Sequence, residues 1–231
     1  ACSARYTDIL KEIMSFLTKL RCLITAGQGV TGSNINVDVL DDPIQMFGQW
    51  FEQAKDTGIV LPESLTLATA SAEGKPSARV VLLKSYDDSG FVFFTNYGSR
   101  KGQELTENPH AAMVFHWNIL QRQVRIEGSI ERVSEAESLA YFHSRPRGSQ
   151  IGAWASYQSQ EIDCRETLAL KAKEIEAQYA GKEIPLPPFW GGFKLTPHTM
   201  ELWQGRADRL HDRYTFTKDA QDSWQRKLLS P

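Results

Sequence analysis

The strongest constraint on the fold is a series of short segments in which apolar residues recur at every second position. This is the period of a β-strand with one buried face. The predicted strands of this series are 64–70, 77–84, 90–95, 111–117 and 121–128. Links as short as 87–90 and 118–120 leave no room for crossover helices. Neighbouring strands therefore run antiparallel, which predicts a meander or a barrel.

Helices and further strands surround this series. Asp42 before Pro43 is typical of a helix N-terminus, and Ser134 with Glu137 forms a capping box. The predicted helices begin at 43, 135 and 161 and end near 57, 144 and 179, and the further strands are 193–195, 199–204, 210–216 and 224–229. The pattern predicts an α+β fold, an antiparallel β-barrel with peripheral helices.

Residues 1–41 look like a separate N-terminal extension. Apolar positions between 9 and 24 suit an amphipathic helix, and GQGVTG follows at 27–32. A dinucleotide-binding loop of that pattern would open a helix, whereas the next residues are rich in turn formers and β-branched side chains. We interpret the glycines as a loop.

Composition excludes several classes of function. The 231 residues carry a net charge of −2, so the overall field favours neither nucleic acid nor an anionic membrane. No apolar run reaches the ~20 residues that span a bilayer. Three distant cysteines without CxxC spacing argue against disulfides and zinc, and they favour a reducing, cytoplasmic compartment. The five histidines lack the spacing of metal ligands, so no metal is expected.

Side chains that can donate hydrogen bonds to a phosphate recur along the chain. Arg79 and Lys84 end one apolar strand and point to opposite faces, so they would reach one ligand only if it wrapped the strand end. Arg100 and Lys101 enter a helix where free N–H groups favour an anion. Each stretch taken alone also suits a solvated surface.

Two further clusters share this character. Tyr141, Arg145 and Ser149 lie four residues apart and could form a phosphate cradle, with the last of them beyond the break at Pro146. Arg209, His211 and Arg213 alternate and would leave one face of a strand. Gln158 and Ser159 precede a predicted helix, where they would cap it and offer another anion site. Together these donors suit a phosphorylated cofactor beside a phosphorylated substrate.

With these stretches in view, the chain resembles the pyridoxine/pyridoxamine 5′-phosphate oxidases, FMN enzymes of vitamin B6 metabolism in the split-barrel flavoprotein family. The matching stretches are SARVVLLK (77–84), FFTNYGSRKG (93–102), QRQVRIEG (121–128), YFHSRPRGSQIGAWAS (141–156) with QS (158–159), and WQGRADRLHDR (203–213). They run in family order over 42–231. The family's N-terminal Arg-x-x-Tyr segment has no counterpart in residues 1–41, which puts closure over the substrate in doubt.

The resemblance implies a homodimeric split β-barrel over 42–231 with FMN at the subunit interface. The residues implied to bind FMN are Arg79, Val80, Val81, Leu82, Phe94, Thr95, Arg100, Lys101, Gln123, Gln158, Ser159, Trp203 and Arg213. Those implied to bind substrate are Lys84, Tyr141, Arg145, Ser149, Arg209, Leu210 and His211, of which Arg209 and His211 are the catalytic pair. Arg79 and Lys84 would then serve two different ligands.

The implied reaction is oxidation of pyridoxine 5′-phosphate and pyridoxamine 5′-phosphate to pyridoxal 5′-phosphate, with hydride transfer to FMN and reduction of O₂ to H₂O₂. Two alternatives stay open from the sequence. One is another split-barrel flavoprotein, such as a flavin reductase. The other is a non-catalytic protein that binds FMN or pyridoxal phosphate. A Rossmann dehydrogenase does not fit, because the short-linked strands lack crossover helices.

Overall fold

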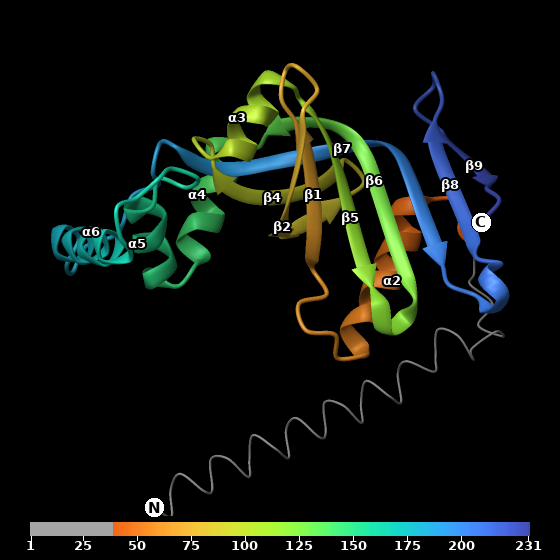
Figure 1. Ribbon diagram of the computed structural model, residues 1–231, viewed down its shortest axis with the longest axis horizontal. Coiled ribbons are helices and arrows are strands. Elements are labelled where there is room, and N and C mark those ends of the chain that lie inside the picture. The colour runs from red at the N-terminus through yellow and green to blue at the C-terminus, as the bar shows by residue number, and fades with distance from the viewer. Residues whose placement is uncertain (1–38) are drawn as a thin grey trace, which may run out of the picture. The chain divides into compact units, whose positions relative to one another are not determined.

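The computed structural model describes residues 39–231. The predicted helix at 9–24 and the glycine loop at 27–32 lie outside the described residues. The described chain divides into two units, one of 64–113 with 126–198, the other of the residues up to Glu63 with 114–125 and 199–231. Figure 1 labels the elements.

One antiparallel sheet runs through the chain in the strand order β2-β1-β5-β6-β7-β4-β3, with β8 on β7 and β9 on β8. The strands are β1 (Ser64–Ala70), β2 (Pro76–Leu82), β3 (Ser85–Asp87), β4 (Gly90–Asn96), β5 (His110–Trp117), β6 (Arg122–Arg132), β7 (Trp190–Gln204), β8 (Asp212–Lys218) and β9 (Trp224–Leu228). The pairs β1–β2, β3–β4, β4–β7, β7–β8 and β8–β9 are antiparallel. The predicted antiparallel α+β architecture is confirmed.

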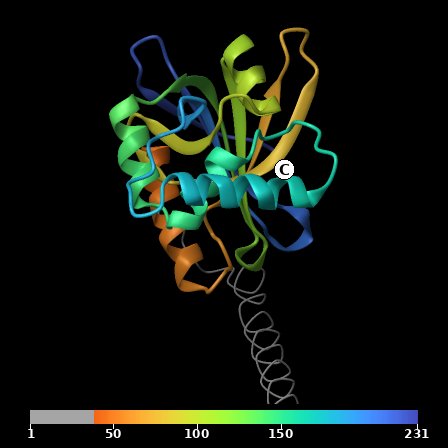
Figure 2. The ribbon, with the colours of Figure 1, turned by 90° about the vertical axis from the view of Figure 1, so that its left-hand side faces the viewer.

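In the unit of 64–113 and 126–198, alternation decides which side chains form the core. Leu65 and Leu67 are buried on β1, and Phe93 of β4 lies opposite Phe193 of β7 with ring centroids 5.9 Å apart. The helices α3 (Arg100–Glu107), α4 (Glu135–Ser144), α5 (Arg147–Ala155) and α6 (Arg165–Gln178) belong to this unit. Figure 2 shows α6 lying across the neighbouring helices.

In the other unit, α2 (Pro43–Asp56) supplies the core. Asp42 caps its start by accepting hydrogen bonds from the next turn, as the sequence predicts. Phe47 and Trp50 are buried, and the Phe47 ring packs 5.0 Å from Phe115 of β5. Short 3₁₀ turns at η1 (Asn118–Leu120) and η2 (Ala207–Arg209) join the strands of this unit.

Several predicted boundaries are wrong for identifiable reasons. The strand predicted at 77–84 ends at Leu82, so Lys84 lies in the link before β3, a strand that the sequence analysis missed. The strands predicted at 193–195 and 199–204 are one continuous strand, β7. This strand pairs with β4 as far as Leu195 and with β8 from Thr199 onward. A proline between the two pairings interrupts neither.

Two errors concern helices. Pro146 ends α4, but it also starts α5, which was not predicted; proline suits a helix start because the first N–H groups lack partners anyway. The helix predicted from 161 begins at Arg165 after Cys164, so Gln158 and Ser159 do not cap it. No described helix is long and apolar enough to cross a membrane.

Candidate functional site

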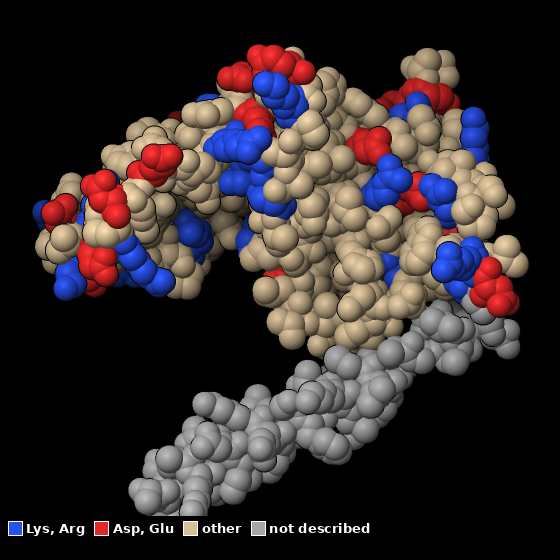
Figure 3. Space-filling view, in the orientation of Figure 1, with Lys and Arg blue, Asp and Glu red and all other residues tan. Residues whose placement is uncertain are grey.

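A cavity of about 970 Å³ opens in the unit of 64–113 and 126–198, at the upper end of the size range of small-molecule sites. Figure 3 shows basic side chains gathered around a hollow on this face. The predicted site residues that line the cavity are Arg79, Val80, Val81, Leu82, Lys84, Phe94, Thr95, Arg100, Lys101, Tyr141, Arg145, Ser149, Gln158 and Ser159. Residues from β2, β4, α3, α4 and α5 are therefore brought together as the sequence predicts.

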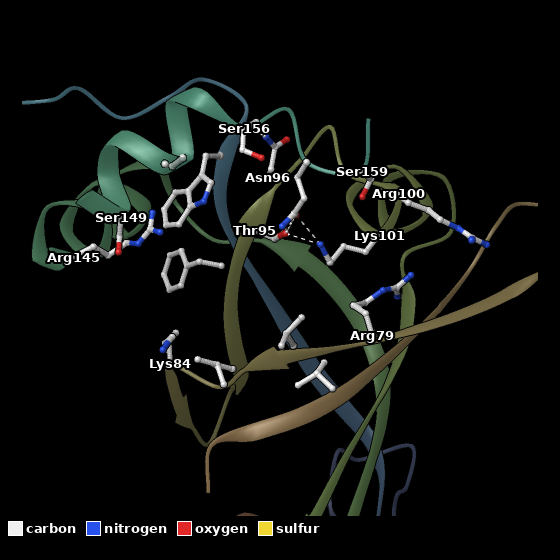
Figure 4. A pocket seen from close by; sticks show the side chains of 18 of the residues that line it. Arg79, Lys84, Thr95, Asn96, Arg100, Lys101, Arg145, Ser149, Ser156 and Ser159 are labelled. Carbon is white, nitrogen blue, oxygen red and sulfur yellow. Dashed lines mark hydrogen bonds between the residues drawn. The ribbon is translucent and has the colours of Figure 1, made fainter. Parts of the chain in front are cut away.

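At one end of the cavity, cations gather around the start of α3 (Figure 4). Ser99 caps this helix by accepting a hydrogen bond from Gly102 N–H. The buried Glu104 carboxylate contacts Arg79 at 3.2 Å and Arg100 Nε at 2.9 Å. Hydroxyls of Thr69 and Ser77 also donate to this carboxylate, so Glu104 fixes the two arginines at the cavity wall.

The third cation of this cluster, Lys101, makes no ion pair with Glu104. Its ammonium donates to Gln158 Oε1 at 2.7 Å and to Thr95 Oγ1 at 3.1 Å. Burial, with the nearby Arg79 charge, lowers the pKa of Lys101 to about 8. Among the described residues no carboxylate pairs with this buried ammonium, which leaves its charge available to an anion.

At the other end lie Lys84, Arg145 and Ser149 (Figure 4). Arg145 caps the C-terminus of α4 in an extended conformation that ends the helix. Its guanidinium lies 4.7 Å from the centroid of the Trp190 ring, and its buried Nη1 has no hydrogen-bond partner. Burial lowers the pKa of Arg145. An unpartnered buried donor of this kind is costly unless a ligand completes it.

Apolar and aromatic groups separate the two cationic ends. Val80 of β2 is 65% exposed, although its side chain is apolar. Phe94 stacks on Tyr141 with ring centroids 4.0 Å apart and an interplanar angle of 22°. These surfaces offer contact to flat rings, whereas the ends offer contact to anions.

The remaining predicted residues, Gln123, Trp203, Arg209, Leu210, His211 and Arg213, lie in the other unit. The prediction that Arg209, His211 and Arg213 share one strand face is wrong, because β8 begins only at Asp212. Arg209 ends η2 with a φ of 59°, in left-handed backbone that cannot continue a strand. Leu210 is 70% exposed.

The loop that holds this group is fastened at both ends. Arg206 pairs with Asp212 at 2.6 Å, and the backbone N–H of Arg206 donates to His211 Nδ1 at 3.1 Å. The neutral His211 ring therefore carries its proton on Nε2. The His211 and Trp203 rings lie 4.6 Å apart. Arg213 is held by Glu201 through two hydrogen bonds of 2.8 and 3.0 Å.

Glu104 and Trp190 are among the residues of the cavity region that sequence reasoning missed. Glu104 could have been found from its spacing of four residues after Arg100 on a helix, which favours an ion pair. Trp190 lines the cavity, but nothing local in the sequence distinguishes it from an ordinary core residue. Among the described residues, no cluster of His, Cys, Asp and Glu could hold a metal ion.

Comparisons with known proteins identify the family of this chain. Residues 51–179 match the family model described as pyridoxamine 5′-phosphate oxidase. A pyridoxine/pyridoxamine 5′-phosphate oxidase of Psychromonas ingrahamii is 56% identical over 218 residues, which cover 94% of this chain and 100% of that protein. The chain belongs to the pyridoxamine 5′-phosphate oxidase family.

Other matches extend this family assignment. Residues 190–231 match the C-terminal dimerisation region of pyridoxine 5′-phosphate oxidase. An oxidase of the same name from Colwellia psychrerythraea is 50% identical over 94% of this chain and 100% of its own length. The crystal structure of PhzG from Burkholderia lata 383, in complex with tetrahydrophenazine-1-carboxylic acid, has a TM-score of 0.80 at 35% identity and covers 84% of this chain and 95% of that one. The predicted split-barrel fold is confirmed.

Proposed function

We propose that this protein oxidises pyridoxine 5′-phosphate and pyridoxamine 5′-phosphate to pyridoxal 5′-phosphate, with FMN as its cofactor. One observation carries the proposal: a single cavity has a cationic cluster at each end and apolar walls between them. Two phosphate monoesters, each bearing a flat ring, match that arrangement of charge and surface. The family assignment supports the same reaction.

The residues at the α3 end fit FMN. Three cations, Arg79, Arg100 and Lys101, lie there beside one carboxylate, that of Glu104, which pairs with the two arginines. The cluster therefore has two positive charges in excess, which is the charge needed to balance a phosphate dianion. The exposed Val80 side chain on β2 gives the flavin ring an apolar contact. Arg79, Arg100 and Lys101 would hold the phosphate.

The residues at the α4–α5 end fit the phosphate of the substrate. Arg145 brings a donor without a partner, Lys84 brings a second cation, and Tyr141 and Ser149 line the same wall. A guanidinium donates along a fixed fork, so it orients a phosphate as well as binding it. Lys84 faces this end because it lies beyond β2, which explains how it and Arg79 serve different ligands.

The residues named above would hold FMN, and the bound cofactor would supply the redox chemistry: the substrate carbon would lose a hydride and a proton, and O₂ would be reduced to H₂O₂. The protein holds both rings and orients their reacting atoms. Arg209 orients the substrate, and His211 donates a hydrogen bond from Nε2–H near the reacting group. Trp203, Gln123 and Arg213 complete the flavin site.

The protein acts as a homodimer with FMN at the interface between the two copies. The match of 190–231 to a dimerisation region supports the pairing of chains. The catalytic domain spans 42–231, and residues 1–41 form an extension of it. The sparse cysteines support a cytoplasmic location.

Purified protein tests the proposal directly. We expect it to be yellow, to bind FMN in a ratio near one per chain, and to release H₂O₂ with pyridoxamine 5′-phosphate. NADH is the control substrate, because a flavin reductase would consume it. Activity with NADH alone favours the reductase, and bound flavin without any turnover favours a binding protein.

The catalytic assignment has its own test. Replacing Arg209 by leucine should lower turnover while the flavin stays bound, because the side chain touches substrate and not the phosphate of FMN. Unchanged turnover in the Arg209→Leu variant rules out this role.

A further inference from the structure

We propose that Trp190 is a positioning residue for the substrate, which holds the Arg145 guanidinium against its indole face so that the donors of Arg145 stay free for the substrate phosphate. This inference rests on the proposed function and deepens it. It assigns a role to an aromatic residue outside the family motifs quoted above.

The contact itself has the geometry of a cation–π interaction. The central carbon of the guanidinium lies 4.7 Å from the Trp190 ring centroid, well within the ~6 Å limit, and tryptophan is the strongest aromatic partner. The Phe142 ring is farther, at 6.0 Å. Trp190 is therefore the main support of the Arg145 side chain.

A carboxylate is the other kind of group that could hold the Arg145 guanidinium in place. Among the described residues Arg145 makes no ion pair, and its buried Nη1 makes no hydrogen bond. A carboxylate would occupy two N–H donors and would repel a phosphate placed beside it. An aromatic face stabilises the same charge without using any donor. Arg145 thus stays charged and oriented, and its N–H donors remain available to a phosphate.

Trp190 can support the Arg145 side chain because packing and strand pairing hold it in place. The residue is 7% exposed, and its ring lies nearly parallel to the rings of Phe94, 5.5 Å away, and Tyr141, 6.1 Å away. Its backbone pairs with Asn96 in the β4–β7 ladder. The next residue, Gly191, lets the Tyr97 side chain lie directly against the β7 backbone, since a Cβ there would lie 2.0 Å from the Tyr97 hydroxyl oxygen.

The same stack links the two ends of the cavity. Phe94, which the family resemblance assigns to the flavin, contacts both Trp190 and Tyr141, which lines the substrate end. A shift of the indole would therefore move the arginine that receives the substrate phosphate. It would leave the Arg79–Glu104 cluster, which receives the flavin phosphate, in place.

The test compares Trp190→Leu with a matched variant, Trp154→Leu. Trp154 packs in the same hydrophobic cluster, on Phe189 and Tyr179, but it does not line the cavity or contact Arg145. The holoenzyme of each variant is assayed for kcat and KM with pyridoxamine 5′-phosphate. Inhibition by inorganic phosphate and flavin absorbance are measured in the same samples.

In Trp190→Leu we expect KM for the phosphorylated substrate and the inhibition constant of inorganic phosphate to rise by about tenfold. Its kcat should stay within about twofold of the wild-type value and the flavin should remain bound. Trp190→Phe, which keeps a smaller ring, should raise KM by about threefold. Trp154→Leu should lower thermal stability without changing KM.

A double-mutant cycle completes the test. In an Arg145→Leu background, Trp190→Leu should raise KM no further, because the tryptophan acts through the arginine. An unchanged KM in Trp190→Leu, an equal rise in Trp154→Leu, or an additive rise in the double variant overturns the inference. If Trp190→Leu does not fold, the Trp190→Phe result decides in the same way.

Failure of the proposed function gives a different result. A wild-type protein that binds flavin but does not oxidise pyridoxamine 5′-phosphate refutes the reaction. In that event, calorimetry can measure the affinity of the wild-type protein and of the Trp190 variants for inorganic phosphate. This measurement still decides whether Trp190 supports the anion site. Equal phosphate affinity in the two proteins overturns it.

Discussion

Replacing Glu104 by glutamine tests whether one buried carboxylate organises the cationic end of the cavity. The Glu104 side chain is 8% exposed and receives hydrogen bonds from two hydroxyls and two guanidinium groups. Burial raises the pKa of this carboxyl, but those hydrogen bonds outweigh it and lower the pKa from 4.5 to about 2. The folded protein therefore strongly favours the ionised form.

The expected loss of stability follows from that pKa. A fall from 4.5 to about 2 corresponds to about 3 kcal/mol at neutral pH. Arg100 is 64% exposed, so solvent screening weakens its share, and we expect Glu104→Gln to lower the free energy of unfolding by about 2 kcal/mol. Because the folded pKa is depressed, this stability is present above pH 4.5 and is lost as pH falls through 2.

The assay is urea unfolding of protein stripped of flavin, so that ligand binding does not contribute. The difference between wild type and Glu104→Gln should be constant from pH 7 to about pH 5.5 and should be about 0.8 kcal/mol smaller at pH 4. Glu107→Gln is the matched control, since Glu107 lies on the same helix and is exposed. Equal stability of Glu104→Gln and wild type at pH 7, or a difference that does not shrink at pH 4, contradicts the reasoning.

Three further predictions concern other parts of the protein. FMN affinity should fall as pH rises above about 8, where Lys101 loses its proton, and Lys101→Arg should flatten the profile in a fluorescence titration. Gly191→Ala should lower the free energy of unfolding by about 3 kcal/mol through overpacking, whereas Gly148→Ala, whose Cβ would meet nothing within 4 Å, should raise it by about 0.5 kcal/mol in a helix. Asp212→Asn should reduce kcat on the order of tenfold at unchanged flavin content, because Arg206 no longer fastens the loop. Equal melting temperatures of the two glycine variants, or full activity of Asp212→Asn, would count against these assignments.

Signals that act within a few residues were readable from the sequence. Asp42 and Ser134 each cap the helix predicted to follow, because a side-chain oxygen there satisfies N–H groups only two or three residues away. The strand 64–70 was predicted with its observed bounds, because alternation over seven residues is a local pattern. Most of the predicted cavity lining came from the family motifs that these elements carry.

What depended on distant contacts was decided only by the tertiary structure. Lys84 and Arg209 were placed on strands by their spacing, but the pairing of β2 with β1 ends at Leu82 and β8 begins only at Asp212. The Lys84 N–H donates instead to Val92 of β4. Glu104 is drawn to Arg79 across 25 residues of sequence, and Trp190 meets Arg145 across a longer interval still. The sequence by itself determined which side chains could bind two phosphates; packing determined which of them face the cavity, because burial and partnership are properties of the neighbours and not of the residue.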